Sequence, residues 1–232
     1  MLDAHVVKAR TRFTVDVALK VASGEACGLF GISGAGKSTI LACIAGSETQ
    51  DAGHVRLDDV TLFPPLLPLH RRSIGYLTQD ANLFPHLQVA ENVRFGLTNG
   101  ARETSESWIV ELRDRLNLEP IWHEPVHAIS GGQARRVALA RMLARKPRLV
   151  LLDEPFAGLD RYLVRELLAT IARWQKELGF TMLVVDHASD VLERLCPRAI
   201  AIEEGRIVQD ARWPELRAHP ATPLLGELLA PL

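Results

Sequence analysis

The sequence predicts an α/β fold in which helices cover both faces of a parallel sheet, with a small antiparallel β layer and a helical subdomain added to it. Two observations predict this fold. Short apolar runs at residues 26–30, 148–152, 181–185 and 199–202 have the composition of strands that are buried on both faces. Helical patterns separate these runs, and strands that alternate with helices form a parallel sheet.

The first 79 residues alternate between strand signals and a single helix. Residues 13–21 have the period of a strand, and a turn at residues 23–25 leads into the buried strand 26–30. A helix is expected at 40–45, ending at Gly46. Two short strands, 54–57 and 73–77, flank a proline-rich segment. We expect this section to form the antiparallel layer.

Helical patterns fill the stretch between Asp80 and Lys146. Apolar residues recur at spacings of three and four over residues 88–96, 103–116 and 133–144. A further amphipathic helix is expected at 161–178, and the tail is helical with two proline breaks. We therefore expect one domain over residues 1–232. Its core would be 1–79 and 147–210, with a helical subdomain at 80–146 and a C-terminal tail at 211–232.

Composition excludes several classes of protein. A chain of 232 residues that is 47% hydrophobic and 24% charged is neither disordered nor a coiled-coil rod. A net charge of -1 provides no overall positive field for nucleic acid or anionic lipid. The three cysteines are widely spaced, so we expect reduced, buried thiols in the cytosol. A secretory signal and an apolar stretch of about 20 residues are both missing, so a membrane role would require a partner.

A glycine-rich loop follows the strand at 26–30 and precedes a helix. It fits the pattern G-x-x-x-x-G-K-[ST], in which backbone N–H groups converge on phosphate oxygens at the start of a helix. Lys37 would add a positive charge at the terminal phosphates, and the hydroxyl of Ser38 would bind Mg²⁺. The expected nucleotide-binding residues here are Gly31, Ser33, Gly34, Ala35, Gly36, Lys37, Ser38 and Thr39.

Two adjacent carboxylates, Asp153 and Glu154, end the apolar strand at 148–152. Ligands of open α/β sheets bind at this edge. Because neighbouring strand residues point to opposite sides, we assign Asp153 to the metal and Glu154 to the general base that faces the attacking water. Alone, an acidic strand end would equally suit a helix cap, so this assignment depends on the glycine-rich loop.

A second anion site is expected at the helix that begins near Ser130. The segment Ser130, Gly131, Gly132 and Gln133 combines a serine cap with two glycines. A phosphate-binding helix start so far from the first loop suits two copies of the chain that hold nucleotide between them. A serine-capped helix with a flexible entry is the structural alternative.

With these segments, the sequence resembles the nucleotide-binding subunits of ATP-binding-cassette (ABC) transporters over nearly its whole length. The Walker A loop is at 31–39 and Walker B at 149–154, the signature is 130–133 with Ile129 in place of the usual leucine, and the D-loop is 157–160. Gln79 matches the Q-loop glutamine and His187 the switch histidine. The resemblance implies a P-loop NTPase core of the RecA type, with ATP and Mg²⁺ as cofactors.

Gln79 and His187 have roles that agree with this resemblance. The Gln79 amide could contact Mg²⁺ or water while its backbone hinges the two lobes, and His187 could hydrogen-bond a γ-phosphate oxygen and hold Glu154 and the water in line. The alternatives are that Gln79 is an ordinary polar residue at the end of a strand and that His187 has a structural role. The family stacks adenine on an aromatic near the N-terminus, where Phe13 is the nearest candidate; a core role suits Phe13 equally.

The resemblance also implies partners. In the family, two cassettes form a head-to-tail dimer, and a groove in the helical lobe receives a short helix of the membrane permease. Here Leu83, Phe84 and Leu87 are the docking candidates, with core packing as the alternative. The chain would then lie at the cytoplasmic face of the membrane. An extracytoplasmic solute-binding protein would take part indirectly, and nucleic acid would not.

Residues 69–76 and 82–87 are similar to the molybdate-importer branch. Sulfate, ferric-iron and polyamine importers share much of this pattern. Molybdate ATPases typically continue into a C-terminal oxyanion-binding regulatory domain, which is not expected here because the sequence stops at Leu232. A soluble ABC ATPase of DNA repair or translation is the alternative from another class, and a P-loop kinase or GTPase would have no use for the segment 130–133.

Overall fold

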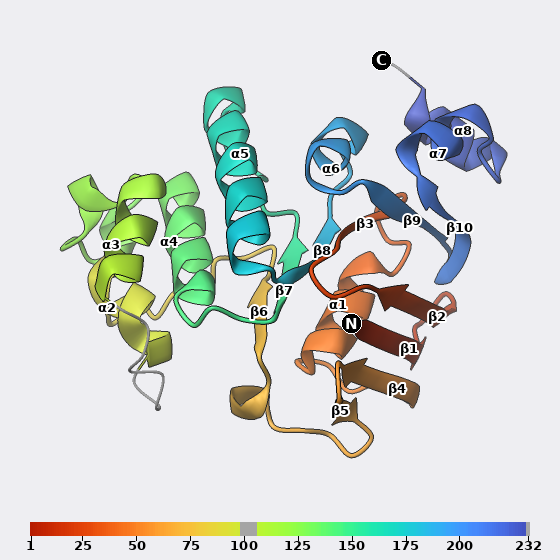
Figure 1. Cartoon of the computed structure of the whole chain (residues 1–232), viewed down its shortest axis with the longest axis horizontal. Helices are drawn as coiled ribbons and strands as arrows, with labels where there is room; N and C mark the ends of the chain where they lie inside the picture. The colour runs from red at the N-terminus through yellow and green to blue at the C-terminus, as the bar shows by residue number, and fades with distance from the viewer. Residues whose placement is uncertain (98–105, 231–232) are drawn as a thin grey trace.

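The computed structural model describes residues 1–97 and 106–230, and two sheets dominate them. In Figure 1 the strands occupy the middle and right of the molecule, and the helices α2 (Val89–Arg94), α3 (Glu106–Arg115) and α4 (Gly131–Leu143) gather at the left. The arrangement is the predicted one, a mixed α/β fold with a parallel sheet, an antiparallel layer and added helices.

The larger sheet has six strands in the order β10-β9-β3-β8-β7-β6. All neighbouring pairs are parallel except β10 with β9. The strands are β3 (Ala26–Phe30), β6 (Ile74–Leu77), β7 (Leu149–Asp153), β8 (Thr181–Val185), β9 (Arg198–Glu203) and β10 (Arg206–Arg212). The carboxyl ends of β3, β7 and β8 therefore lie at one edge, where the motif residues follow them.

The smaller sheet is antiparallel, in the order β2-β1-β4-β5. Its strands are β1 (Leu2–Ala9), β2 (Thr14–Val21), β4 (Ala52–Leu57) and β5 (Val60–Phe63). Helix α1 (Lys37–Ala45) contributes to one buried apolar cluster with this sheet and with alternate residues of the parallel strands, among them Leu149 and Leu151. That position between two sheets explains why α1 is apolar on most of its surface.

The opposite face of the parallel sheet packs against helices. Val150 and Leu152, which alternate with the residues just named, join a cluster with α4, α5 (Arg161–Leu178) and α6 (Ser189–Leu195). The same cluster continues into α3 through Trp108 and Ile109. The C-terminal helices α7 (Trp213–Ala218) and α8 (Pro223–Leu229) also join it.

One expectation about the sheets is wrong. The strand expected at 73–77 does not belong to the antiparallel layer, because β6 pairs in parallel with β7 at the edge of the large sheet. The sequence pattern does not predict the strands β1, β5 and β10, the helix α6 or the short 3₁₀ helices at 69–71, 119–121 and 126–128. The other helices and strands agree with expectation to within a few residues. Residues 103–105 and 231–232 of the expected helices lie outside the described residues.

The expectations about cysteines and membrane spans can also be compared with the structure. Cys27, Cys43 and Cys196 are buried free thiols, and burial raises the pKa of Cys43 to about 11. Within residues 1–97 and 106–230, no helix has the length and apolar composition needed to cross a bilayer.

Candidate active site

The glycine-rich loop connects β3 to α1 and is tightly packed. A Cβ on Gly31 would lie 2.2 Å from the carbonyl oxygen of Ile202 on β9, and a Cβ on Gly36 would lie 2.9 Å from Cγ2 of Val15 on β2. Gly36 also has φ 102°, in the left-handed region. Larger residues at these positions would push the loop off both sheets.

Lys37 is buried within this loop. Its side chain is 7% exposed, and Nζ donates to the carbonyl oxygens of Gly31 at 2.8 Å and Ile32 at 2.7 Å. Burial lowers the pKa of this ammonium, while the charges of Glu154 and Asp153 oppose that shift. The cation is thus held against the loop that would surround phosphate groups.

Asp153 ends β7 and contacts the loop through Ser38. The Ser38 hydroxyl donates to Oδ1 of Asp153 at 3.0 Å, and Asp153 is 4% exposed. Burial raises the pKa of Asp153, and the hydrogen bond from Ser38 opposes that shift. A hydroxyl and a carboxylate at contact distance are the oxygen donors that Mg²⁺ prefers, so these residues fit a magnesium site.

Glu154 turns away from the strand that carries Asp153. Its φ is 47°, and its N–H donates to the carbonyl oxygen of Val185 at 2.9 Å, which fixes the backbone at the end of β8. Its half-buried side chain accepts a hydrogen bond from Nε2 of Gln79, 3.0 Å from Oε2. The two carboxylates therefore have separate environments.

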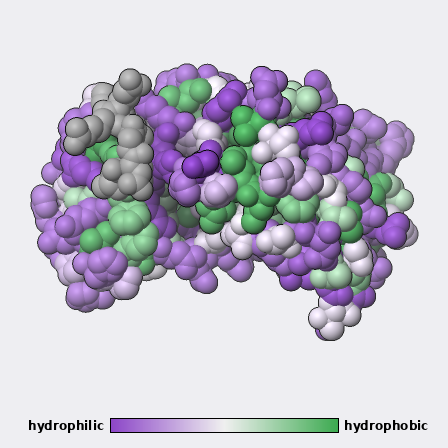
Figure 2. All heavy atoms as spheres, turned by 90° about the horizontal axis from the view of Figure 1, so that it is seen from below, coloured by the Kyte–Doolittle hydropathy of each residue, from purple (hydrophilic) through white to green (hydrophobic). Residues whose placement is uncertain are grey.

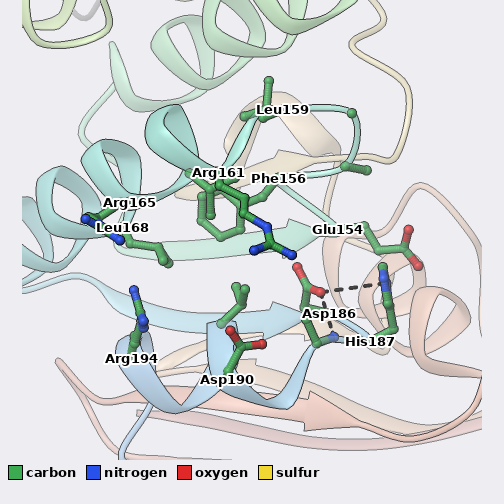
Figure 3. A pocket seen from close by; sticks show the side chains of 15 residues that line it. Glu154, Phe156, Leu159, Arg161, Arg165, Leu168, Asp186, His187, Asp190 and Arg194 are labelled. Atoms are coloured by element: carbon green, nitrogen blue, oxygen red, sulfur yellow. Dashed lines mark hydrogen bonds and ion pairs between the residues drawn. The ribbon is translucent and has the colours of Figure 1, made fainter. Parts of the chain in front are cut away.

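His187 follows β8 and contacts its neighbour Asp186 rather than Glu154. The His187 side chain is 69% exposed, with Nδ1 3.7 Å from Oδ1 of Asp186. Asp186 is 4% exposed and accepts the Ala188 N–H at 2.9 Å, and burial raises its pKa. Figure 3 shows Glu154, Asp186 and His187 together at one end of a cavity of about 580 Å³ between α5 and α6.

A separate cavity of about 570 Å³ adjoins the glycine-rich loop and brings most of the predicted residues together. It is lined by Arg10, Thr11, Arg12, Phe13, Ser33, Gly34, Gly36, Lys37, Ser38, Thr39, Gln79 and Glu154. Ala35 is 2% exposed and does not line it, and neither does Gly31. Because Glu154 lines both cavities, its carboxylate lies at the boundary between them.

Phe13 lies at the edge of this cavity and also packs against protein. Its ring is half-buried, and Cβ atoms added to Gly36 and Gly205 would lie 3.5 and 2.8 Å from it. Phe13 therefore both lines the cavity and packs against Gly36 and Gly205.

The sequence interpretation missed the cavity-lining residues Arg10, Thr11 and Arg12. Arg10 donates to Oγ1 of Thr39 through two nitrogens, at 3.2 and 2.8 Å. A turn carrying two arginines just before Phe13 is the signal that could have predicted this cationic wall.

The segment that begins α4 lies in a different cavity. Ser130 and Gln133 form a capping box, in which Ser130 Oγ accepts the Gln133 N–H at 3.3 Å and Gln133 Oε1 accepts the Ser130 N–H at 2.7 Å. Their cavity, about 700 Å³, includes Gly131, Gly132 and residues 157–160, and Gln79 lines both this cavity and that of the loop. Within one chain the segment 130–133 therefore does not line the cavity of the glycine-rich loop.

A protein-family model described as "ABC transporter" matches residues 14–157, more than half of the chain. The chain belongs to the ABC transporter family. Among solved structures, it resembles two dimeric structures of the ATP-binding cassette MJ0796. One is a post-hydrolysis state bound to ADP and Pi, with a TM-score of 0.80, 28% identity and coverage of 91% of this chain and 98% of the other. The second has a TM-score of 0.81, with the same identity and coverage.

Curated relatives of this ABC protein are import ATP-binding proteins. The chain is 40% identical to the Fe(3+) ions import ATP-binding protein FbpC of Pseudomonas fluorescens, over 88% of this chain and 58% of the relative. It is 35% identical to the molybdenum import ATP-binding protein ModC of Rhodobacter capsulatus, over 97% of this chain and 62% of the relative. It is 38% identical to the thiamine import ATP-binding protein ThiQ of a Jannaschia species, over 95% of this chain and 97% of the relative.

These relatives differ in length and in the substrate that they are named for. The chain spans about three fifths of the iron and molybdenum proteins and nearly all of the thiamine protein. The predicted resemblance to importer ATPases such as ModC is confirmed. The narrower choice of molybdate is not, because the names include three cargoes.

Proposed function

We propose that this ABC protein is the ATP-hydrolysing subunit that powers a membrane importer. The observation that carries the proposal is the convergence of Lys37, Ser38, Gln79 and Glu154 around one cavity, with Asp153 hydrogen-bonded to Ser38. The family match and the import ATP-binding relatives support it.

The chemistry follows from the separate environments of the two carboxylates. The glycine-rich loop and Lys37 bind the phosphates, and Phe13 with the cationic turn at 10–12 holds the remainder of the nucleotide. Glu154, at the open side of the cavity, takes a proton from water as its oxygen attacks the terminal phosphorus, releasing ADP and phosphate. His187 lines the neighbouring cavity beside Glu154, and in this proposal its imidazole turns to donate to a terminal phosphate oxygen.

Ser38, Asp153 and the Gln79 side chain would hold Mg²⁺. When bound, the ion neutralises charge on the phosphate oxygens. A buried carboxylate with a hydroxyl in contact is a suitable ligand pair, since both supply oxygen and Asp153 has little access to bulk water.

A second copy of the chain completes the site in this proposal. The segment 130–133 lines its own cavity, away from the glycine-rich loop of the same chain, and presents a helix start suited to an anion. A head-to-tail homodimer would bring Ser130, Gly131, Gly132 and Gln133 of one copy against ATP on the other. The two MJ0796 structures, which are dimeric, support the assembly of two copies.

Opening and closing of this dimer would drive the permease. We propose that residues 80–146 move as a helical subdomain against a core made of 1–79 and 147–210, with residues 211–232 as a tail. ATP binding closes the dimer and hydrolysis reopens it, so that lobe motion is transmitted to the membrane subunits.

We propose that the permease docks on the face shown in Figure 2. An apolar strip crosses the middle of this face, between the helical lobe on the left and the strands on the right. Leu66 and Leu69 are among the exposed apolar residues, at 47% and 56%. Phe84 lines a cavity of about 270 Å³, and the Arg141 guanidinium lies 5.2 Å from the centroid of its ring.

The three docking candidates differ in position. Phe84 lines the cavity, whereas Leu83 is partly buried against the main core and Leu87 is outside the cavity lining. Phe84 therefore carries the docking proposal, and core packing suits Leu83 better.

The cargo is proposed only by similarity. Molybdate remains our first candidate, and ferric iron, sulfate and polyamines are alternatives; the thiamine relative widens this set. The partners would be a transmembrane permease and, indirectly, an extracytoplasmic solute-binding protein, with the chain at the cytoplasmic face of the membrane.

Phosphate release from MgATP by the purified chain tests the proposed activity. We expect Glu154→Gln to bind ATP normally but to hydrolyse it about 10²- to 10⁴-fold more slowly, because the base is lost, and to accumulate as an ATP-bound dimer. The exposed Glu166→Gln variant makes the same charge change on α5 and should hydrolyse ATP at the normal rate. Normal turnover in Glu154→Gln would refute the base assignment.

A further inference from the structure

Arg135, one helical turn into α4, connects that helix to the loop that contains Gln79. It is 8% exposed and donates through Nη1 to the carbonyl oxygen of Thr78 at 3.2 Å and through Nη2 to the carbonyl oxygen of Gln79. A guanidinium that satisfies two successive carbonyls fixes the loop in position and in orientation. Arg135 does not line the cavity of the glycine-rich loop.

Gln79 extends this connection to the proposed base. Its backbone is held by Arg135 from the helical side, and its side-chain Nε2 donates to Oε2 of Glu154 at 3.0 Å. Glu154 is in turn tied to β8 through its N–H. A continuous path of hydrogen bonds therefore runs from α4, whose first residues follow Ser130, to the carboxylate of Glu154.

A second arginine of α4 holds the other end of the same loop. Arg141 donates to the carbonyl oxygens of Asn82 at 2.8 Å and Ala81 at 3.1 Å. Six residues separate the two arginines, which places them about 9 Å apart along the helix. Four carbonyls within residues 78–82 are thus bound by α4, so this loop follows α4 when that helix moves.

From these contacts we propose that Arg135 is a positioning residue that sets the Gln79 amide against Glu154 according to where α4 lies. The inference rests on the proposed ATPase function and deepens it. While Gln79 donates to Glu154, one oxygen of that carboxylate is occupied. Movement of α4, as when a second copy engages residues 130–133, pulls the Gln79 backbone through Arg135 and changes that pairing.

The geometry distinguishes Arg135 from Arg141. Only Arg135 bonds the Gln79 carbonyl, so its loss should affect Glu154 through Gln79, whereas loss of Arg141 should loosen the far end of the loop. Loss of a group that orients a metal ligand costs about 10- to 100-fold in affinity or activity, and we expect a similar effect from a residue that orients Gln79. We therefore expect Arg135→Gln to lower kcat about tenfold or more, with KM for ATP and nucleotide affinity within about twofold of wild type.

A double-mutant cycle with Gln79→Ala tests the proposal on the purified full chain. The double variant Arg135→Gln/Gln79→Ala should hydrolyse ATP no more slowly than Gln79→Ala alone. Both changes break the same hydrogen-bond path from Arg135 through Gln79 to Glu154. Arg141→Gln with Gln79→Ala is the matched comparison, and its effects should multiply. Arg135→Lys, which cannot reach both carbonyls with planar geometry, should recover only part of kcat.

Two outcomes would overturn the inference. If the effects of Arg135→Gln and Gln79→Ala multiply, the two residues act independently. If Arg135→Gln raises KM and lowers the melting temperature together, its role is structural. If the wild-type chain hydrolyses ATP but the effects of Arg135→Gln and Gln79→Ala multiply, only this inference is rejected. If the wild-type chain has no ATPase activity, the proposed function itself is rejected.

Discussion

At the scale of single residues, the site separates two carboxylates that are adjacent in the sequence. Asp153 is buried and hydrogen-bonded to Ser38, while Glu154 has a left-handed backbone and a half-buried side chain paired with Gln79. This difference supports one carboxylate as a metal ligand and the other as a base. A neutral amide at Glu154 would keep the shape and lose the basicity.

At the residue scale, we predict that replacing Lys37 lowers the affinity for nucleotide. Lys37→Ala removes a cation held by Gly31 and Ile32 against the loop, and a hydrogen bond to a charged group contributes about 1.5 to 3 kcal/mol. We expect ATP affinity, measured with a fluorescent analogue, to fall about 10- to 100-fold. The exposed Lys176→Ala variant should bind normally. Equal affinity in both variants would place the phosphate site elsewhere.

The residues that the sequence predicted are those that share a short motif. The glycine-rich loop and the pair at 153–154 follow predicted strands, so their positions could be inferred from local pattern. Arg135 could not, because its acceptors are 56 and 57 residues away, and nothing local indicates which carbonyls a helical arginine will meet. For Arg10, the two arginines before Phe13 indicate a cationic turn, but nothing local indicates that Arg10 contacts Thr39 in α1, beyond two intervening strands.

At the scale of elements, the local sequence pattern predicts where a strand lies in the chain but not which strands it pairs with. Strand β6 has the expected position in the sequence, yet it pairs in parallel with β7, and within it Gly75 lies close to Met142 and Pro147. A Cβ on Gly75 would lie 2.6 and 2.9 Å from them. Strand β10 was missed because, as an antiparallel edge strand, it carries charged residues such as Asp210 that disguise a strand pattern.

Arg72 gives an element-scale prediction about stability. It is 3% exposed, and its guanidinium donates to the last carbonyls of α1, those of Ile44 and Ala45, and to those of Leu62 and Leu67. Arg72→Met leaves the carbonyls of Ile44, Ala45 and Leu67 without this donor, whereas the Leu62 carbonyl still accepts the Leu67 N–H at 3.0 Å. Each unsatisfied buried group costs about 1 to 3 kcal/mol. We expect the free energy of unfolding in urea to fall by about 3 kcal/mol or more.

The matched control for Arg72 is an exposed arginine on β4. Arg56→Met removes the same charge at a surface position and should change the free energy of unfolding by less than about 0.5 kcal/mol. Equal stability of the two variants would show that the bonds of Arg72 do not hold α1 and the proline-rich segment together.

At the scale of the whole molecule, the separation of cavities implies assembly. The glycine-rich loop and the segment 130–133 line different cavities of one chain, and Gln79 lines both. A dimer in which each copy completes the other's site explains why both surfaces are open. Motif order was sufficient to predict the ABC transporter family, which the family match shows, whereas no motif distinguishes between the cargoes that the relatives are named for.

Affinity purification of a tagged Glu154→Gln chain from gently solubilised native membranes tests the transport role most directly. We predict that a multi-span membrane protein co-purifies with it in the presence of ATP, and that adding Phe84→Glu in the docking cavity reduces this recovery. Recovery of soluble proteins or nucleic acid alone, with the same profile for both variants, would contradict the transport role.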